Sequence, residues 1–263
     1  MKKAHTITTY YMTYVRIFVL ALLSVLFVTI VPLVSLLREI QEFLLNQVVN
    51  MGILYAIISG FLLSITLRRR QSLDEYISLE LNKIRRIYHL SLHLKEAEPR
   101  LAKWFNSLKD ALKKYQDRFR GESFSKYDEG NPLFREVTYT IYRLPSLGII
   151  YNTELYRSLL DAAATATESR EFIRSKMTNA IGFFQWLVIG MVTVTLGIIL
   201  VGSTPKDLTS TLAAAAVIFN LFLVLLLLYE YDHSNSKKDQ YLASVYANNL
   251  SELNNGSKMS KKG

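Results

Sequence analysis

Four long apolar stretches limit what this chain can fold into. They cover residues 17–37, 48–67, 180–202 and 208–229, and none of them contains Asp, Glu, Lys, Arg or His. About 18 or more such residues are enough to cross a hydrocarbon core roughly 30 Å thick. Inside lipid, every backbone polar group must be paired within its own segment, so each stretch is expected to be a helix. The sequence therefore predicts an all-α integral membrane protein with four transmembrane helices in two pairs.

The segments outside the predicted spans are polar and hold most of the positive charge. They are the N-terminal segment 1–16, the middle region 68–179 and the tail 230–263, whereas each short loop between paired spans has a single Lys or Arg. Short loops on the cytoplasmic side of a membrane carry an excess of Lys and Arg. We therefore predict a multi-pass protein of the cell (inner) membrane with both termini and the 68–179 region in the cytoplasm. The polar end of the tail is predicted to be disordered.

The middle region has the apolar periodicity of amphipathic helices. No proline lies between Val48 and Lys95, so the second span is expected to continue beyond the membrane as one helix. Pro99 is expected to end it, and a second helix is predicted from Leu101 to Phe119. Apolar residues recur every three or four positions in the extension, at Leu73, Ile77, Leu81, Ile84, Tyr88 and Leu92. The 68–179 region is therefore predicted to be a helical cytoplasmic domain.

Three apolar residues of the second span form one stripe. Ile53, Ile57 and Phe61 are spaced by four, which places them on the same side of a helix. In a channel, such a stripe forms a constriction that gates by losing its water. Bulky residues at this spacing also face lipid or neighbouring helices in membrane proteins that conduct nothing. Periodicity alone leaves both interpretations open.

Small and amide side chains in the last two spans indicate close helix packing. Gly182, Gly190 and Gly197 recur at heptad-like spacing, and Asn220 lies in the middle of the last span. Small residues let membrane helices approach closely, and a buried amide adds an interhelical hydrogen bond of about 1 kcal/mol. We assign these four residues to helix packing.

Charged groups next to the spans have two interpretations each. Arg68, Arg69 and Arg70 follow the second span, where they serve either as a positive-inside anchor or as a vestibule that attracts anions. Two histidines, His89 and His93, share a helix face, but two ligands are weak evidence for a metal. Two acidic residues after the last span, at 230 and 232, fall short of the six to eight oxygens that calcium prefers. We predict no metal site.

Enzyme signatures are absent from the sequence. It contains no G-x-S-x-G, H-E-x-x-H, phosphate-loop or dinucleotide-binding motif and no cysteine. The net charge of +9 is explained by membrane anchoring without a nucleic-acid partner. We predict a non-enzyme with no catalytic residues, no cofactor and no nucleic acid as partner.

Three segments carry a family resemblance. They run from Asn46 to Tyr76, from Glu80 to Tyr88 and from Tyr151 to Lys176. Together with the order of two spans, a helical insert, two spans and a tail, they resemble the bestrophins, which are pentameric anion channels. The likeness is greatest to the prokaryotic members that are grouped as bestrophin-like proteins.

The resemblance implies roles for particular residues. The neck of bestrophins is lined by three apolar residues of the second span, the last of which is the Phe of a Gly-Phe pair; this pattern corresponds to Ile53, Ile57 and Phe61 here. The acidic calcium clasp of the animal members is absent, so no calcium gating is expected. The resemblance also implies a homo-oligomer, namely a pentamer.

We therefore expect an oligomeric channel in the lipid bilayer that passes chloride or other small anions through a pore lined by residues 48–67. The alternative is a non-conducting membrane scaffold whose cytoplasmic helical domain binds a partner. An exposed apolar groove on residues 70–179 and the absence of a continuous axial path would indicate the scaffold.

Overall fold

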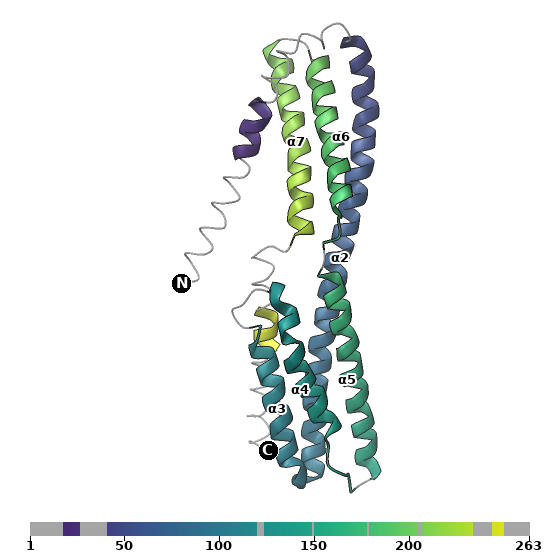
Figure 1. Ribbon diagram of the computed structural model, residues 1–263, viewed down its shortest axis with the longest axis vertical. Coiled ribbons are helices and arrows are strands. Elements are labelled where there is room, and N and C mark those ends of the chain that lie inside the picture. Colours follow the sequence, from purple (N-terminus) through teal and green to yellow (C-terminus); the bar gives the residue numbers. More distant parts are fainter. Residues whose placement is uncertain are drawn as a thin grey trace. The chain divides into compact units, whose positions relative to one another are not determined.

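The computed structural model describes residues 18–26, 41–119, 124–148, 150–177, 179–204, 207–233 and 244–249. Its helices are α2 (Gln41–Ala97), α3 (Ala102–Asp117), α4 (Asn131–Tyr142), α5 (Ile150–Lys176), α6 (Phe183–Ser203) and α7 (Leu208–Asp232), with the short 3-10 helices η3 (Pro99–Leu101) and η4 (Phe124–Gly130) (Figure 1). Residues 18–26 and 244–249 are also helical. No strand occurs among these described residues, which confirms the all-α prediction for them.

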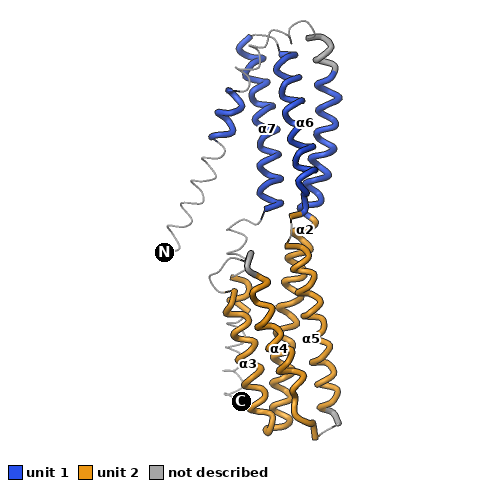
Figure 2. Tube along the Cα trace, in the orientation of Figure 1, with its two compact units in different colours: residues 1–67, 180–233 blue, residues 68–179, 234–263 orange. Residues whose placement is uncertain are grey.

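The chain divides into two compact units (Figure 2). Unit 1 comprises residues 1–67 and 180–233, and unit 2 comprises residues 68–179 and 234–263. Helix α2 is continuous and contributes its first part to unit 1 and its last part to unit 2. The unit boundaries fall where the sequence analysis places the passage from membrane to cytoplasm. The cytoplasmic location of unit 2 stays a prediction.

Three described helices are long and apolar enough to cross a membrane. They are Gln47–Ala97, Phe183–Ser203 and Leu208–Asp232. They contain the predicted spans 48–67 and 208–229 and nearly all of 180–202. Of the predicted first span, 17–37, residues 18–26 are helical and the remainder lies outside the described residues. The segment 1–16 and most of the tail, 234–243 and 250–263, also lie outside them.

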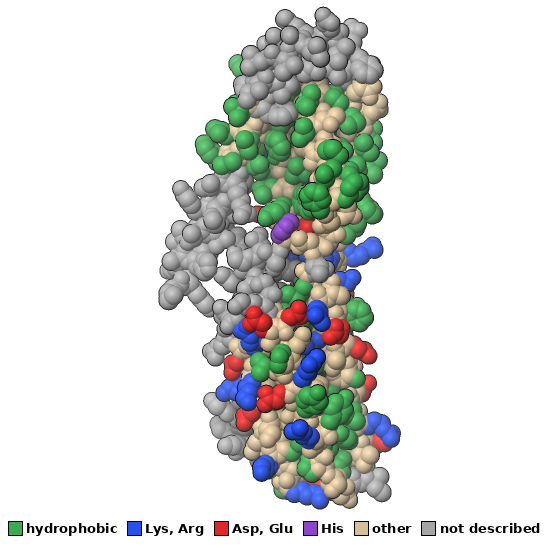
Figure 3. Space-filling view, in the orientation of Figure 1, with side chains coloured by type: hydrophobic (Ala, Val, Ile, Leu, Met, Phe, Trp, Pro, Cys, Tyr) green, Lys and Arg blue, Asp and Glu red, His purple; other side chains and the backbone are tan. Residues whose placement is uncertain are grey.

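Unit 1 is apolar both inside and outside. Its core contains Tyr55 and Leu62 from α2, Ile189 and Leu196 from α6, and Leu221, Leu228 and Ile181. Its exposed surface is equally apolar, and Figure 3 shows hydrophobic side chains gathered over these helices. Large exposed apolar surfaces mark membrane or protein contacts rather than water-facing surface. The exterior of unit 1 therefore suits lipid or neighbouring membrane helices.

Unit 2 has a buried apolar core and charged side chains on its surface. Figure 3 shows charged side chains over its helices. The predicted periodic positions of α2 supply much of its core, since Leu73, Ile77, Leu81, Ile84 and Tyr88 are all buried. They pack with buried residues of the other helices, among them Trp104, Leu108, Leu112, Val137, Ile141, Leu159 and Ile173.

The connection from α4 to α5 is held by one carboxylate. Glu98 accepts hydrogen bonds from the backbone N–H of Gly148 at 3.1 Å and from Asn152 Nδ2 at 2.6 Å. The hydrogen bond from Asn152 is the main reason why the pKa of Glu98 lies below its usual value. Helix α5 begins at Ile150, and Asn152 in its first turn makes one of these contacts.

Candidate functional site

Helix α2 has two different faces where it lies in unit 1. Tyr55, Leu62 and Thr66 are buried against the other helices of the unit. The Tyr55 hydroxyl donates to the carbonyl oxygen of Leu221 on α7 at 2.9 Å, which ties the two helices together. The orientation of α2 about its own axis is therefore fixed within unit 1.

The predicted stripe lies on the opposite face of α2. Ile53, Ile57 and Phe61 are 56%, 64% and 64% exposed in the single chain. Val49, one turn before Ile53, is 63% exposed and extends the stripe. The three residues thus lie together and point away from their own unit, so they face either lipid or further copies of the chain. Their role as a pore neck stays a prediction.

Of the three arginines that follow, Arg68 continues the stripe. It lies seven residues, about two helical turns, after Phe61 and eleven residues, about three turns, after Ile57. All three residues therefore share one side of α2. Arg68 is exposed, whereas Arg69 and Arg70 are half-buried. Consecutive residues of a helix are roughly 100° apart, so the three guanidinium groups fan out around α2. Only the first of them shares the direction of the apolar stripe.

The predicted packing residues lie in different surroundings. Gly197 is buried in α6, Gly190 is half-buried and Gly182 is the exposed residue before α6. A Cβ added at Gly190 would meet no described atom within 4 Å apart from the neighbouring residues and the nearby backbone of its own helix. Asn220 is exposed on α7. Among the described residues of unit 1, Gly197 is buried within the chain, and the packing role of the other three stays a prediction.

Asp232 organises the ends of α6 and α7. It is fully buried, and its Oδ1 accepts hydrogen bonds from the backbone N–H groups of Ala180 at 2.7 Å and Ile181 at 3.0 Å. The indole Nε1 of Trp186 donates to Oδ2 at 3.3 Å. A carboxylate suits this place because the backbone N–H groups of a segment outside a helix need an acceptor when they are buried. The contacts of Asp232 make it an anchor for the start of α6.

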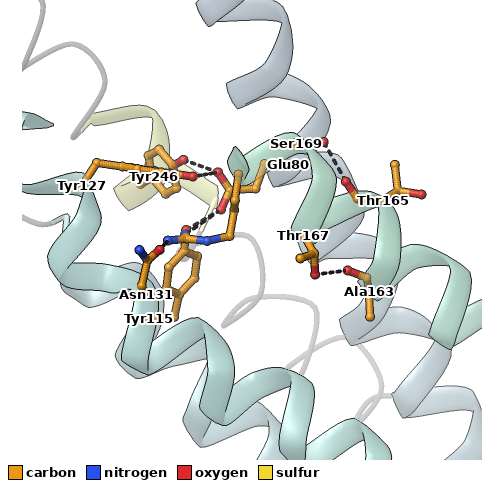
Figure 4. A network of polar contacts seen from close by, with 10 residues as sticks. Glu80, Tyr115, Tyr127, Asn131, Ala163, Thr165, Thr167, Ser169 and Tyr246 are labelled. Atoms are coloured by element: carbon orange, nitrogen blue, oxygen red, sulfur yellow. Dashed lines mark hydrogen bonds and ion pairs between the residues drawn. The ribbon is translucent and has the colours of Figure 1, made fainter. Parts of the chain in front are cut away.

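Unit 2 contains a buried charged cluster that the sequence analysis did not single out. Glu80 on α2 is fully buried, and Figure 4 shows three tyrosines gathered around its carboxylate. The hydroxyls of Tyr127 and Tyr246 donate to Oε2 at 2.8 and 2.7 Å, and the Tyr115 hydroxyl donates to Oε1. Burial raises the pKa of Tyr127 and Tyr246 well above the usual 10, so both hydroxyls keep their protons.

An arginine balances the charge of Glu80. Arg170 Nη1 on α5 is 3.4 Å from Glu80 Oε1, and its Nη2 donates to Asn131 Oδ1 at 2.5 Å. Its guanidinium also lies 4.7 to 4.8 Å from the ring centres of Tyr115, Tyr127 and Phe134. Burial raises the pKa of Glu80, and the charge of Arg170 acts against this shift. The cluster ties α2, α3, η4, α5 and the 244–249 segment into one body.

No metal centre is formed by the described side chains. Among them, no three His, Cys, Asp or Glu side chains come together in a way that would hold an ion. His93 pairs instead with Glu96, with 3.5 Å between Nδ1 and Oε2.

Comparisons with known proteins cover most of the chain. Residues 15–235 match the family model of the Bestrophin-like domain. A search of curated proteins found no match. Among solved structures, a mutant of a bacterial bestrophin homologue from Klebsiella pneumoniae is similar, with a TM-score of 0.67, 14% identity and coverage of 91% of this chain and 99% of that one. A second mutant of that homologue has a TM-score of 0.65, with 14% identity and coverage of 90% and 98%. These similarities extend over almost the full length of both chains and establish the fold.

Proposed function

Because the chain belongs to the bestrophin-like family, we propose that it forms a homo-oligomeric anion channel, a pentamer, with α2 lining the pathway. In this proposal the protein is not an enzyme, it lies in the cell membrane with both termini in the cytoplasm, and it passes chloride or other small anions. Ile53, Ile57 and Phe61 form the neck. The Arg68–Arg70 group forms the basic entrance, with Arg68 closest to the path.

The observation that carries the proposal is the outward apolar stripe of α2. The opposite face of the helix is fixed inside unit 1, so the stripe is available to other copies around an axis. A closed ring of identical chains places the same residue of each copy at the same height. Five copies of Ile57 would then form one narrow hydrophobic ring, of the kind that controls wetting in channels.

Anion preference follows from the charges near this path. No acidic side chain lies between residues 47 and 67 of α2. The residue that follows, Arg68, is exposed on the same side of the helix as the apolar stripe. A basic entrance with low-dielectric walls raises the local concentration of anions. Apolar walls with positive charge at the cytoplasmic end therefore favour anions over cations.

Introduced cysteines test the proposal, because the natural chain contains none. Ile57→Cys protein would be placed in liposomes and chloride efflux measured before and after a negatively charged methanethiosulfonate reagent. We expect modification to reduce the flux by several-fold, because it attaches bulk and negative charge in the neck.

Ile198→Cys on α6 is the matched control. Ile198 is also exposed in the single chain, but it lies on another helix. A neck at Ile57 would be contradicted if the reagent reduced chloride flux equally in both variants. It would also be contradicted if both variants conducted and the reagent changed the flux of neither.

One observation favours a partner-binding scaffold instead. Tyr139, Tyr142 and Phe172 in unit 2 are 60%, 67% and 47% exposed, and such aromatic side chains are common at protein interfaces. In a ring, the same residues are available to neighbouring copies. The absence of any flux from a folded oligomer would favour the scaffold.

A further inference from the structure

The exposed side of α4 in unit 2 carries aromatic and positively charged side chains. This α4 stripe consists of four exposed residues, Arg135, Tyr139, Tyr142 and Arg143. They are spaced by three or four, or adjoin one another at the end of the helix, so they lie on one side of it. The acidic residue of α4, Glu136, pairs with Lys114 at 3.4 Å, and within the described part of the chain no ion pair involves either arginine. The stripe therefore presents two positive charges with a tyrosine midway between them.

The exposed side of α5 carries the opposite charge. This α5 stripe consists of four exposed residues spaced by three or four, Asp161, Ala164, Glu168 and Phe172. The arginine of this stretch, Arg170, is buried beside Glu80 and adds no positive charge to the surface. Among the described residues, no ion pair involves Asp161 or Glu168. The stripe therefore presents two negative charges with a small alanine between them and an aromatic ring at one end.

The two stripes match in spacing as well as in charge. With a rise of about 1.5 Å per residue, the arginines of α4 are about 12 Å apart along the helix and the carboxylates of α5 about 10 Å. Figure 1 shows that α4 and α5 run in opposite directions in unit 2. In an antiparallel pairing of the stripes, Arg143 would meet Asp161. Arg135 would then meet Glu168, and the tyrosine between the arginines would face the alanine between the carboxylates.

We propose that the α4 stripe of one copy packs against the α5 stripe of the next copy. This inference rests on the proposed homo-oligomer and names a contact that holds it together in unit 2. Both stripes are exposed in the single copy, so they do not meet within it. A contact between two different surfaces repeats from copy to copy and can close into a ring.

The charges of the stripes select this arrangement over a two-fold contact. Two α4 stripes would bring arginines together, and two α5 stripes would bring carboxylates together. Opposite charges across an interface fix its register, whereas like charges suppress the wrong pairing. Tyrosine and arginine are also enriched at protein interfaces, which suits the composition of the α4 stripe.

Paired cysteines test the contact in the full-length protein, because the natural chain contains none. Protein with Tyr139→Cys and Ala164→Cys would be purified in detergent, oxidised with copper phenanthroline and separated on a denaturing gel without reductant. We expect a ladder of linked chains beyond the dimer, because each copy offers one cysteine to each of its neighbours. Each single-cysteine variant should remain mostly monomeric on the gel. So should Tyr139→Cys with Lys113→Cys, which moves the second cysteine to an exposed position on α3.

An exchange of charges tests the register. In the protein with cysteines at 139 and 164, Arg135→Glu should reduce the linked fraction several-fold, because it places a second carboxylate opposite Glu168. Adding Glu168→Arg should restore at least half of the linking. Lys113→Glu reverses an exposed charge outside both stripes and should leave the linked fraction unchanged. A ladder that is equally strong in all of these proteins would overturn the charge pairing.

Native mass spectrometry of the samples before oxidation separates this inference from the proposed function. An oligomer that gives no ladder from the cysteines at 139 and 164 would overturn the contact and keep the homo-oligomer. Single-cysteine variants that link as efficiently as the pair would also overturn it, because identical surfaces would then touch. A protein that is monomeric before oxidation would contradict both the contact and the proposed oligomer.

Discussion

In the proposed channel, Arg68 is the charged residue whose position on α2 bears most directly on ion passage. It shares a side of the helix with Ile57 and Phe61 and is exposed, whereas Arg70 points elsewhere and is half-buried. We predict that Arg68→Gln lowers chloride conductance a few-fold at low salt and less at high salt, because salt screens exposed charges. Single-channel recording at two chloride concentrations measures this. Arg70→Gln should have little effect, and equal losses in both variants would assign the arginines to anchoring.

Tyr246 is the residue through which the tail reaches the buried charge of unit 2. Tyr246→Phe removes one donor to Glu80 and leaves the ring in place. We predict destabilisation of about 1–3 kcal/mol, the usual cost of leaving a buried polar group with one partner fewer. The apparent midpoint of thermal unfolding measures it. Tyr142→Phe alters an exposed tyrosine of the same unit and should leave the midpoint unchanged; equal midpoints for all three proteins would be evidence against the cluster.

The apolar stripe of α2 and the cluster around Glu80 differ in how well the sequence alone could identify them. Ile53, Ile57 and Phe61 are separated by single turns of one helix, so periodicity places them together. Glu80 meets partners that are 35, 47, 90 and 166 residues away along the chain. No local pattern encodes such contacts. The one signal within α2 was a carboxylate at a position where the spacing of Leu73, Ile77, Leu81 and Ile84 predicts the buried side.

The turn before α5 is held by the Glu98 carboxylate, which makes unit 2 sensitive to acid. The pKa of Glu98 is lowered, mainly by Asn152, from its usual 4.5. The unfolded chain therefore takes up this proton at a higher pH than the folded chain does. The stabilising contribution of Glu98 is present above about pH 4.5 and is lost as the pH falls through the lower value of the folded state.

We predict that Glu98→Gln lowers the apparent unfolding midpoint at pH 7 and weakens its decline below about pH 4.5. Thermal unfolding of both proteins between pH 3 and 7, on the scale where carboxylates titrate, measures this. Glu154→Gln, an exposed position on α5, is the control. If the unfolding midpoint of Glu98→Gln protein falls with acid as steeply as that of the wild type, the acid sensitivity comes from other groups.

At the level of helices, the apolar stretches were the most informative part of the sequence. Three of the four predicted spans lie in long apolar helices, and the missing prolines correctly indicated that α2 continues far beyond the span. Periodicity does not say which helices pack together in unit 2, because that depends on contacts between distant segments. The helical piece at 244–249 was missed, since six residues carry too short a pattern.

In our proposal, the whole molecule is one subunit of a ring. In a single copy, the apolar stripe of α2 and Asn220 are exposed and Gly190 is half-buried. Lipid alone would accept the stripe but gains nothing from an exposed amide. Neighbouring copies would give each of these groups a contact, and a central axis along α2 would give the stripe a function. The proposed ring would therefore account for this surface.

The reversal potential of the purified protein in a planar bilayer under a chloride gradient tests this account most directly, with Ile57→Ala measured alongside. We predict a reversal potential near the chloride equilibrium value and a conductance that Ile57→Ala raises several-fold, because a smaller side chain widens and wets the neck. A potential near the cation equilibrium value would contradict anion selectivity. A folded oligomer without current would contradict the channel itself.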